Sequence, residues 1–410
     1  MASITDPSVI NRARNADFII FGVNGFAFAT WMSRVPDAKQ LLDLSPGALG
    51  VMLLAISVGS LVGLPVAGRL AHRFGAANTV RFGAIASLPG LVLAAIAVQY
   101  GDSMYWVMPG LFLVGLGFGV WDVSQNLEGT IIEQGLGRAI MPWFHAMFSG
   151  GTVIGALIGA ALVWAGVGMV PHLAAVAVLG GAAAWWATRN FLPAFDEANE
   201  PDAVVGAALP AKQRSAWLEP RTLLIGLVVL AAAFAEGTAN DWMAVAFVDG
   251  HELSNAAGVV ALAVFLIFMT AGRILGTGLL DRYGRVPVLR VLFVAAIAGC
   301  VLVVFGNVWI AFVGCAIWGV GASLGFPVGM SAAADDPRRA ALRLSVVSTI
   351  GYTAFLAGPP LLGFLGNEFG VLNSLLVVGI VSVLALAVVP ATRPLAVAGV
   401  AGNSVGQDAN

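Results

Sequence analysis

Long apolar segments recur along almost the whole chain, and this recurrence limits the fold more than any other feature of the sequence. A helix needs about 20 mostly apolar residues to cross the hydrocarbon core of a bilayer. The sequence therefore predicts an all-α membrane protein with 12 transmembrane helices. The expected segments lie near residues 17–34, 47–70, 80–99, 105–128, 140–165, 169–190, 222–247, 254–280, 286–305, 308–333, 342–366 and 370–391.

The composition fits a chain surrounded by lipid. Of the 410 residues, 59% are hydrophobic and 10% are charged, whereas a soluble domain carries about 25% charged residues. The net charge of −2 argues against a nucleic-acid partner, because phosphate binding needs clustered surplus cations. The sequence contains no nucleophile–base constellation, no metal-ligand spacing and no Walker-type phosphate loop. We therefore expect no enzyme activity, no metal and no cofactor.

The first apolar segment, Phe18 to Met32, resembles the core of a signal peptide, but no small-residue cleavage site follows it. We therefore interpret it as an uncleaved first helix. With the N-terminus in the cytoplasm, all lysines and arginines fall in cytoplasmic segments except Arg34, Lys39 and Arg273. Because cytoplasmic loops carry the excess of cations, the sequence predicts a multi-pass protein of the bacterial inner membrane with both termini in the cytoplasm.

One long polar stretch interrupts the apolar segments and has the composition of a linker. It divides the chain into two halves with six apolar segments each. The predicted parts are an N-terminal six-helix bundle (1–190), a cytoplasmic linker (191–220), a C-terminal six-helix bundle (221–391) and a cytoplasmic tail (392–410).

Two loop segments, one in each half, resemble each other. "GRLAHRFGAANTV" (68–80) and "TGLLDRYGRVPVL" (277–289) each follow the second apolar segment of their half, 209 residues apart. Two similar six-helix halves in parallel register are typical of one class of secondary transporter. The chain is therefore predicted to form two pseudo-symmetric bundles. The aligned pairs are Gly75 with Gly284, Arg73 with Arg282, and His72 with Asp281.

These loops resemble the G-x-L-A-D-R-x-G-R-R motif of the major facilitator superfamily. Three further stretches, "GVWDVSQN", "MPWFHAMFSGG" and "VSTIGYTAFLAGPPLLGF", resemble a mostly uncharacterised bacterial branch that is described as sugar-porter-like or efflux-like. Through the span count, the linker and the duplicated loop, the resemblance covers essentially the whole chain. It implies the fold of that superfamily.

The resemblance also implies that the loops join the two halves at the cytoplasmic face and separate when the gate opens. In the first copy His72 stands where the acid belongs, and Ala76 and Ala77 stand where basic residues are usual. A purely topological role of the arginines carries equal weight. The gating-loop candidates are Gly68, His72, Arg73, Gly75, Asp281, Arg282, Gly284 and Arg285.

Acidic and amide side chains interrupt the apolar fourth and seventh segments. A charge in hydrocarbon costs about 2.5–3.5 kcal/mol on insertion scales, so Asp122 and Glu236 are expected to face other helices or a watery cavity. A carboxyl group at low dielectric readily keeps a proton. The proton-coupling candidates are Asp122, Glu236, Asp241, His145 and Glu128.

Structural roles remain open for several of these residues. Glu128 also fits a solvated helix end, and Asp241 fits a helix end beside an interfacial Trp242. His145 suits either a proton relay with Glu128 or Asp122, or a neutral packing role. Asp17 is interpreted as an ordinary flank at the cytoplasmic side of the first segment.

Arg273 is the one cation predicted inside an apolar segment, so it needs a partner. Glu236 or Asp241 on the adjoining segment is the expected partner, either as a structural ion pair or as part of a substrate contact. The resemblance places segments 1, 4, 7 and 10 around a central cavity, where amides offer hydrogen bonds and tryptophans offer ring faces. A helix break is expected at Pro327. The substrate-binding candidates are Asn24, Trp31, Trp121, Gln125, Asn126, Asn240, Trp242, Arg273, Trp318 and Tyr352.

Together these features predict a secondary active transporter that moves a small organic solute across the inner membrane by proton-coupled symport and alternating access. Amides beside aromatic rings suit a sugar-like solute, and the same rings suit an amphipathic metabolite. Efflux by antiport and a non-transporting membrane sensor remain alternatives. The expected partners are the solute, protons and the lipid bilayer, with no nucleic acid, and the chain is expected to be a monomer.

Overall fold

The computed structural model describes residues 7–138, 140–192, 215–336 and 339–395. Most of the predicted linker and tail therefore lie outside the described residues. Every regular element in the described ranges is a helix. The first half contains α1 (Pro7–Met32), α2 (Val35–Leu41), α3 (Pro46–Tyr100), α4 (Met104–Leu136), α5 (Met141–Trp164), α6 (Met169–Ala187) and η1 (Thr188–Asn190). The second contains η3 (Ala216–Leu218), α7 (Pro220–Gly250), α8 (Asn255–Tyr283), α9 (Arg285–Phe305), α10 (Val308–Ala322), α11 (Gly325–Ala333), α12 (Ala340–Phe369), α13 (Val371–Ser374), α14 (Leu376–Val388) and η4 (Val389–Thr392).

Eleven helices of the described chain are long and apolar enough to cross a membrane. One of them, α3, has 55 residues, whereas a single crossing needs about 20. Gly75 interrupts α3 with φ 78° and ψ 163°, a backbone conformation that is essentially restricted to glycine. Counted as two segments on either side of Gly75, α3 makes the structure consistent with the 12 predicted crossings.

The two halves repeat the same local structural features at a constant separation of 209 residues. Two non-glycine residues with positive φ, a serine N-cap and a glycine in the same unusual conformation recur at matching positions. Because positive φ is uncommon, and the three features recur with one common spacing, they confirm the repeat predicted from the loops. The pairs are Asp43 and Glu252 (φ 49° and 55°), Ser45 and Ser254, which cap α3 and α8, and Gly75 and Gly284 (φ 78° and 77°).

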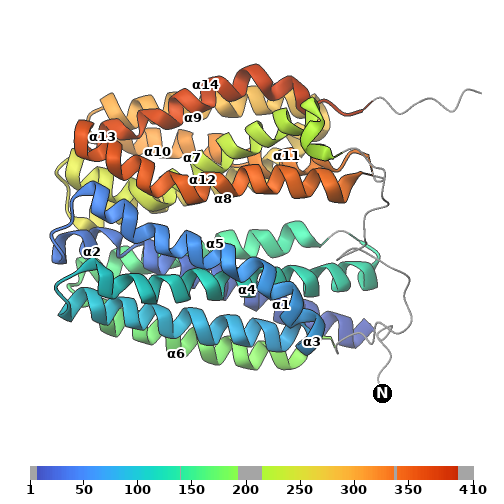
Figure 1. Ribbon diagram of the computed structural model, residues 1–410, viewed down its shortest axis with the longest axis horizontal. Helices are drawn as coiled ribbons and strands as arrows, with labels where there is room; N and C mark the ends of the chain where they lie inside the picture. The colour runs from blue at the N-terminus through green and yellow to red at the C-terminus, as the bar shows by residue number, and fades with distance from the viewer. Residues whose placement is uncertain (1–6, 139, 193–214, 337–338, 396–410) are drawn as a thin grey trace, which may run out of the picture.

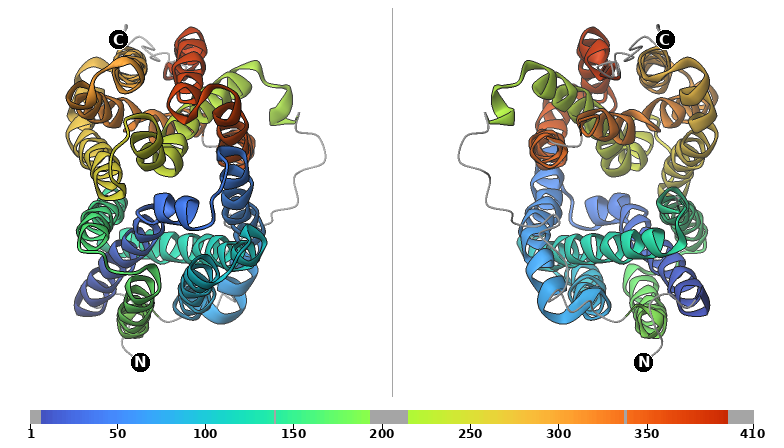
Figure 2. Two further views of the ribbon diagram at one scale, coloured as in Figure 1. Left: turned by 90° about the vertical axis from the view of Figure 1, so that its left-hand side faces the viewer. Right: turned by 90° about the vertical axis from the view of Figure 1, so that its right-hand side faces the viewer.

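The halves form two helical bundles that lie side by side (Figures 1 and 2). Contacts of α3 with α12 and of α5 with α8 join them. We call the end that holds α2 the α2 end, and the end at which α1 and α7 begin the terminal end. The two bundles meet closely at the α2 end, and their ribbons separate toward the terminal end (Figure 1).

Close helix contacts depend on residues without a side chain. A Cβ atom at Gly115 of α4 would collide with the carbonyl oxygen of Ile56 on α3, and one at Gly151 of α5 would collide with that of Gly22 on α1. Lipid offers no hydrophobic force between helices, so such close approach supplies much of the packing energy. The outer surface is apolar, as lipid contact requires: Leu179 is 70% exposed and Leu384 is 66% exposed.

Two elements differ in position from the sequence expectation. The helix that contains the first predicted segment begins at Pro7 rather than near residue 17, because residues 7–16 continue the same helix and its Ile10 and Ala13 pack against the bundle. The tenth segment breaks between Ala322 and Gly325, before the proline at position 327. Pro327 lies in the first turn of α11, where a missing N–H breaks no helical hydrogen bond.

We predict that Gly115→Ala lowers the melting temperature of the detergent-purified protein, because the added methyl group meets backbone that cannot move aside. Overpacking of this kind costs about 1–3 kcal/mol. Gly379→Ala is the matched control, since a Cβ at Gly379 meets no atom within 4 Å. Equal melting temperatures for the two variants would contradict the packing argument.

Candidate functional site

A chain of polar side chains connects α1 with α4 inside the first bundle. The amide of Asn24 donates to Oε1 of Gln125 at 3.3 Å, and the amide of Gln125 donates to Oδ1 of Asp122 at 3.1 Å. Asn126 donates to the same oxygen at 3.2 Å, which confirms that Asp122 and Asn126 share a face of α4. Asn24 and Gln125 are buried, whereas Asp122 and Asn126 are half-buried. We call these four residues the Asp122 group.

A second polar group centres on Arg273 of α8. Its Nη2 lies 2.7 Å from Oε2 of Glu236 on α7, so the expected pairing with Glu236 is confirmed. The two side chains are 26% and 18% exposed, and the pair is therefore partly accessible from solvent. Nε of Arg273 donates to the carbonyl oxygen of Ser323 at 3.2 Å. That carbonyl lies at the break between α10 and α11, where a backbone acceptor needs a partner outside the helix.

Arg273 also reaches the other bundle. Its Nη1 lies 3.5 Å from Oγ of Ser149 on α5, at the outer limit of hydrogen-bond distance. Ser149, Glu236, Arg273 and Ser323 are called the Arg273 group. One guanidinium, whose donors have a fixed planar geometry, thus connects α7, α8 and the α10–α11 break with the opposite bundle. Any relative movement of the bundles must change this contact.

Two further ionisable side chains approach these groups across the bundle interface. Tyr352 of α12 is close enough to interact electrostatically with Asp122 of α4. His145 of α5 is close enough to interact with Arg273 of α8. The His145 ring is exposed and lies edge-on to Phe21, with centroids 5.4 Å apart. The predicted relay through His145 to Asp122 or Glu128 stays a prediction, because the charge that influences the ring among the described residues is that of Arg273.

The four predicted tryptophans lie inside the bundles. Trp31, Trp121, Trp242 and Trp318 are each 0% exposed and belong to the apolar core. Their role as substrate contacts stays a prediction, whereas the interpretation of Trp242 as an interfacial residue is wrong, because its ring is buried. Packing in an apolar core stabilises a large apolar ring more than exposure to water does. Of the other candidates, Asn240 is buried and Asp241 and Tyr352 are half-buried.

Two acids that were expected near water are buried. Asp17 is 0% exposed and Glu128 is 1% exposed, so neither the flank interpretation nor the solvated helix end holds. Because α1 begins at Pro7, Asp17 lies inside the helix and against the bundle instead of at its start. Oε1 of Glu128 accepts the N–H of Leu192 at 2.7 Å.

The side-chain contacts described for the gating-loop arginines stay within one bundle in this conformation. Arg73 lies over the ring of Phe74 and Arg282 over the ring of Tyr283, each 5.2 Å from the centroid. Arg285 pairs with Asp335 of its own bundle at 2.7 Å.

The other gating-loop candidates divide by conformation and exposure. Gly75 and Gly284 have the backbone conformation that requires glycine, whereas a Cβ at Gly68 would meet no atom within 4 Å. His72 and Asp281 are exposed. The gating role of these loops therefore stays a prediction.

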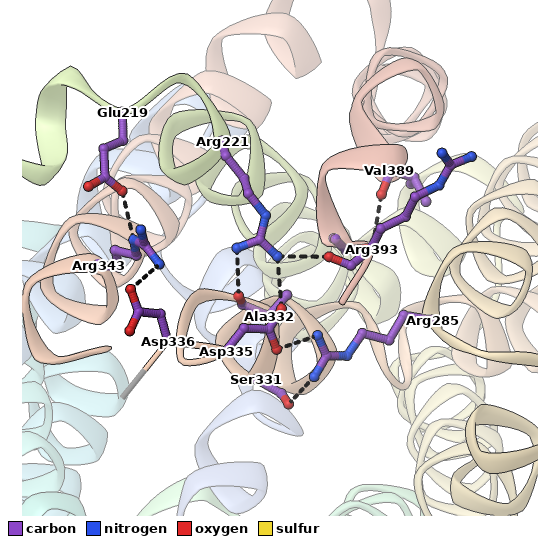
Figure 3. A network of polar contacts seen from close by, with 11 residues as sticks. Glu219, Arg221, Arg285, Ser331, Ala332, Asp335, Asp336, Arg343, Val389 and Arg393 are labelled. Carbon is purple, nitrogen blue, oxygen red and sulfur yellow. Dashed lines mark hydrogen bonds and ion pairs between the residues drawn. The ribbon is translucent and has the colours of Figure 1, made fainter. Parts of the chain in front are cut away.

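Sequence reasoning missed a network of ion pairs at the terminal end of the second bundle (Figure 3). Asp335 receives Arg221 at 2.8 Å and Arg285 at 2.7 Å. Arg221 also donates to the carbonyl oxygen of Arg393 at 2.8 Å. The network thus joins the starts of α7 and α9 to the ends of α11 and η4. In the sequence, the acidic pair in "ADDPRR" was the one feature that could have indicated this network.

Glu219 anchors the other part of this network (Figure 3). Its carboxylate accepts from Arg343 at 2.7 Å and from Thr222 at 2.8 Å, and it also pairs with Arg339. Burial alone raises the pKa of Glu219, but the hydrogen bonds and the two guanidinium charges outweigh burial and lower the pKa below its usual value. The ionised carboxylate therefore ties the start of α7 to the start of α12.

Polar contacts between the bundles gather at the α2 end. They involve α2 and the start of α3 in the first bundle, and the end of α7, the start of α8 and the end of α12 in the second. We call this set the α2-end latch. Its contacts are Lys39 Nζ to Asp249 Oδ2 at 3.0 Å, Asn255 Nδ2 to Asp37 Oδ1 at 2.6 Å and to Gln40 Oε1 at 2.9 Å, and the Gly47 N–H to Asn367 Oδ1 at 2.9 Å.

Repeated six-helix bundles with ionisable groups at their interface define a membrane transporter of the two-bundle class. The sequence model of the Major Facilitator Superfamily matches residues 18–335 and 254–406. The chain belongs to this family, whose members are transporters and in general not enzymes.

Relatives agree with this assignment. The chain is 30% identical over 381 residues to an uncharacterised transporter of this type from Yersinia pestis, and the match covers 92% of this chain and 94% of the relative. It is also 30% identical over 379 residues to an uncharacterised transporter of Sinorhizobium fredii (strain NBRC 101917 / NGR234), with 91% and 96% covered.

Three solved transporters share the fold at low identity. A bacterial homologue of the human lysosomal transporter Spinster, inward-facing and unoccupied, has a TM-score of 0.73, 15% identity and coverage of 95% and 98%. A mutant of the nucleoside transporter NupG has a TM-score of 0.72, 14% identity and coverage of 94% and 99%. FucP in the outward conformation has a TM-score of 0.63, 16% identity and coverage of 92% and 98%.

The Glu219 network predicts an acid-sensitive stability. A carboxyl whose pKa is lowered in the folded state stabilises the fold above the ordinary glutamate value of about 4.3, and this contribution disappears as the pH falls through the lowered pKa. We expect Glu219→Gln to lower the melting temperature at neutral pH and to flatten its fall in acid. The measurement is thermal unfolding of purified protein over a series of pH values.

The control for that series is Glu368→Gln, because Glu368 is exposed and belongs to none of the ion pairs found among the described residues. Its melting curve should follow that of the unmodified protein at every pH. Identical pH profiles for Glu219→Gln and the unmodified protein would remove the carboxylate from any stabilising role.

Proposed function

We propose that this protein is a secondary active transporter that moves a small polar organic solute across the bacterial cytoplasmic membrane by alternating access coupled to protons. The observation that supports it most is the Arg273 group. The ion pair between Arg273 and Glu236 lies inside one bundle, and Arg273 also contacts the Ser149 hydroxyl of the other bundle. Movement of one bundle relative to the other must make and break this contact. A sensor that does not move its ligand has no need of such a contact.

The distribution of cations supports the orientation. The terminal end carries Arg221, Arg285, Arg343 and other arginines, and an excess of cations marks the cytoplasmic side. With the terminal end in the cytoplasm, the α2-end latch closes the outer side. This arrangement of contacts corresponds to an inward-facing conformation.

The polar side chains at the interface favour a hydroxyl-rich solute such as a sugar or a nucleoside. The amide of Asn126, the carboxylate of Asp122 and the hydroxyl of Tyr352 offer both donors and acceptors, which a polyol can use simultaneously. The solved structures of similar fold include a nucleoside transporter and a fucose:proton symporter. These names support the solute class for this chain only as a proposal.

Protons enter the cycle at two carboxyls. A proton on Glu236 removes the negative charge that holds Arg273, and the guanidinium is then free to reorganise with the bundles. Asp122 is held by two amide donors within one bundle and is close enough to interact electrostatically with Tyr352 of the other, so its charge responds to the distance between the bundles. Coupling follows because loading of either carboxyl changes the charge beside a group that meets the other bundle: Arg273 beside Glu236, and Asp122 itself near Tyr352.

The transport proposal is tested in proteoliposomes with an imposed pH gradient and labelled monosaccharides and nucleosides. We expect accumulation in the unmodified protein. Asp122→Asn should abolish accumulation but retain solute exchange, and Glu236→Gln should reduce accumulation at least about tenfold, equivalent to about 1.4 kcal/mol. Asp102→Asn is the control, because Asp102 is an exposed loop residue of the same half.

The outcomes separate the alternatives. Accumulation only with the reversed gradient would replace import by efflux. Saturable binding without flux under either gradient would favour a sensor and sink the transporter proposal. Unchanged coupling in Asp122→Asn would remove that carboxyl from the proton path. If Glu236→Gln and Arg273→Gln lower only the folded yield, the ion pair is structural.

The latch gives a separate prediction about the conformational equilibrium. Lys39→Asp alone and Asp249→Lys alone should shift the protein toward the outward-facing state, and the double variant should restore the balance. An ion pair with this exposure contributes about 0–1 kcal/mol, so the shift should be about fivefold or less.

The shift is measured by thiol labelling of a Thr130→Cys variant. Thr130 is exposed and lies one turn beyond Asn126 on α4, on the side of the terminal end, whereas the native Cys300 and Cys315 are buried. Each single charge variant should slow labelling. A double variant that labels as slowly as the singles would show that the two charges do not act as a pair.

A further inference from the structure

Asp17 is a fully buried carboxyl that the described residues leave without a hydrogen-bond donor. It is 0% exposed, and neither Oδ1 nor Oδ2 has a hydrogen-bond partner. The side chain points at α4, since a Cβ built on Gly129 would lie 3.1 Å from Oδ2 of Asp17. The same position lies 2.9 Å from Sδ of Met141 and 3.2 Å from a ring carbon of Phe144. The Met141 thioether and the Phe144 ring therefore lie near the carboxyl, and neither offers an anion a hydrogen-bond donor.

Glu128 is the charged neighbour that lies close enough to interact with Asp17. It precedes Gly129 on α4, is 1% exposed, and accepts the N–H of Leu192 through Oε1 at 2.7 Å. This bond stabilises the ionised form of Glu128. Two like charges at low dielectric repel strongly, so ionised Glu128 opposes ionisation of Asp17.

No cation in the described part of the chain compensates this pair. Arg14 on α1 is occupied by Asn15 at 3.0 Å, and Arg189 on η1 is exposed. On α5, His145 is exposed at the ring edge of Phe21. Within the described ranges, no arginine, lysine or histidine forms an ion pair with either carboxyl.

The remaining acid of this region is also occupied elsewhere. Glu133 of α4 accepts the N–H groups of Ile140 and Met141 at 2.7 and 2.9 Å, at the start of α5. It therefore offers the pair neither a donor nor a counter-charge.

We propose that Asp17 and Glu128 form a proton-binding site, separate from the Asp122 and Arg273 groups, which holds one proton on Asp17 at neutral pH. An ionised carboxylate without donors in apolar surroundings costs several kcal/mol, whereas a protonated carboxyl costs far less. The N–H of Leu192 favours Glu128 over Asp17 as the member that gives up its proton first. Strongly interacting carboxyls titrate as one unit, so the pair takes up and releases this proton together.

The site is tested by infrared spectroscopy of the purified full-length protein at neutral pH, without solute. The difference spectrum between unmodified protein and Asp17→Asn should contain the carbonyl stretch of a protonated carboxyl. Glu128→Gln should retain that band, because Asp17 itself carries the proton. Asp102→Asn, at an exposed acid, should give no such difference. Asp17→Asn should also keep its melting temperature, since a neutral amide replaces a neutral acid of the same shape.

The site is overturned if the band survives Asp17→Asn, or if it disappears in Glu128→Gln while Asp17 is intact. If Asp17→Asn does not fold, the test is a comparison of the pH at which the unmodified protein and Glu128→Gln lose the band. Removal of the Glu128 charge makes ionisation of Asp17 easier, so Glu128→Gln should lose the band at a lower pH than the unmodified protein. An unshifted titration would overturn the site. The measurement needs neither solute nor gradient, so its failure and the failure of the transport proposal are distinguishable.

Discussion

A charge in hydrocarbon must have a partner, water or a proton, and the polar interior of this protein follows from that constraint. Arg273 satisfies it through Glu236, the Ser323 carbonyl and the Ser149 hydroxyl, and Asp122 through two amides. Asp17 has none of these partners among the described residues. The three groups therefore differ in their expected response to protons, because a cation, amide donors and an apolar surrounding stabilise the ionised carboxylate to different degrees.

The same constraint separates rigid parts of the protein from parts that can move. At the terminal end, the network around Asp335 and Glu219 lies within the second bundle and holds its helices as one body. At the α2 end, Lys39 and Asp249 join the two bundles with partly exposed groups whose attraction water weakens. Ion pairs thus tie helices within the second bundle at one end and join the two bundles at the other.

Much of the fold was predictable because each signal is local. Apolar segment length gave the crossings, and the duplicated loops gave the two halves, since similar sequences form similar backbone at Gly75 and Gly284. The partner of Arg273 was predictable because a lone cation between apolar helices has few acids within reach. The burial of the four tryptophans was not predictable, because an aromatic ring fits a core and a binding site equally well and sequence alone does not separate the two.

The sequence by itself determined that the chain lies in a membrane, that its two halves repeat one pattern, and which ionisable residues lie in the membrane-spanning segments. Only the tertiary structure decided which of these residues meet. Asp17 and Glu128 are over a hundred positions apart, and the burial of each depends on where α1 begins and on how α4, α5 and η1 pack around it. Burial and pairing are properties of three-dimensional contacts. Residues with similar neighbours in the sequence therefore differ in the structure: one forms a salt bridge, one accepts hydrogen bonds from two amides, and one lies in an apolar core without a hydrogen-bond donor.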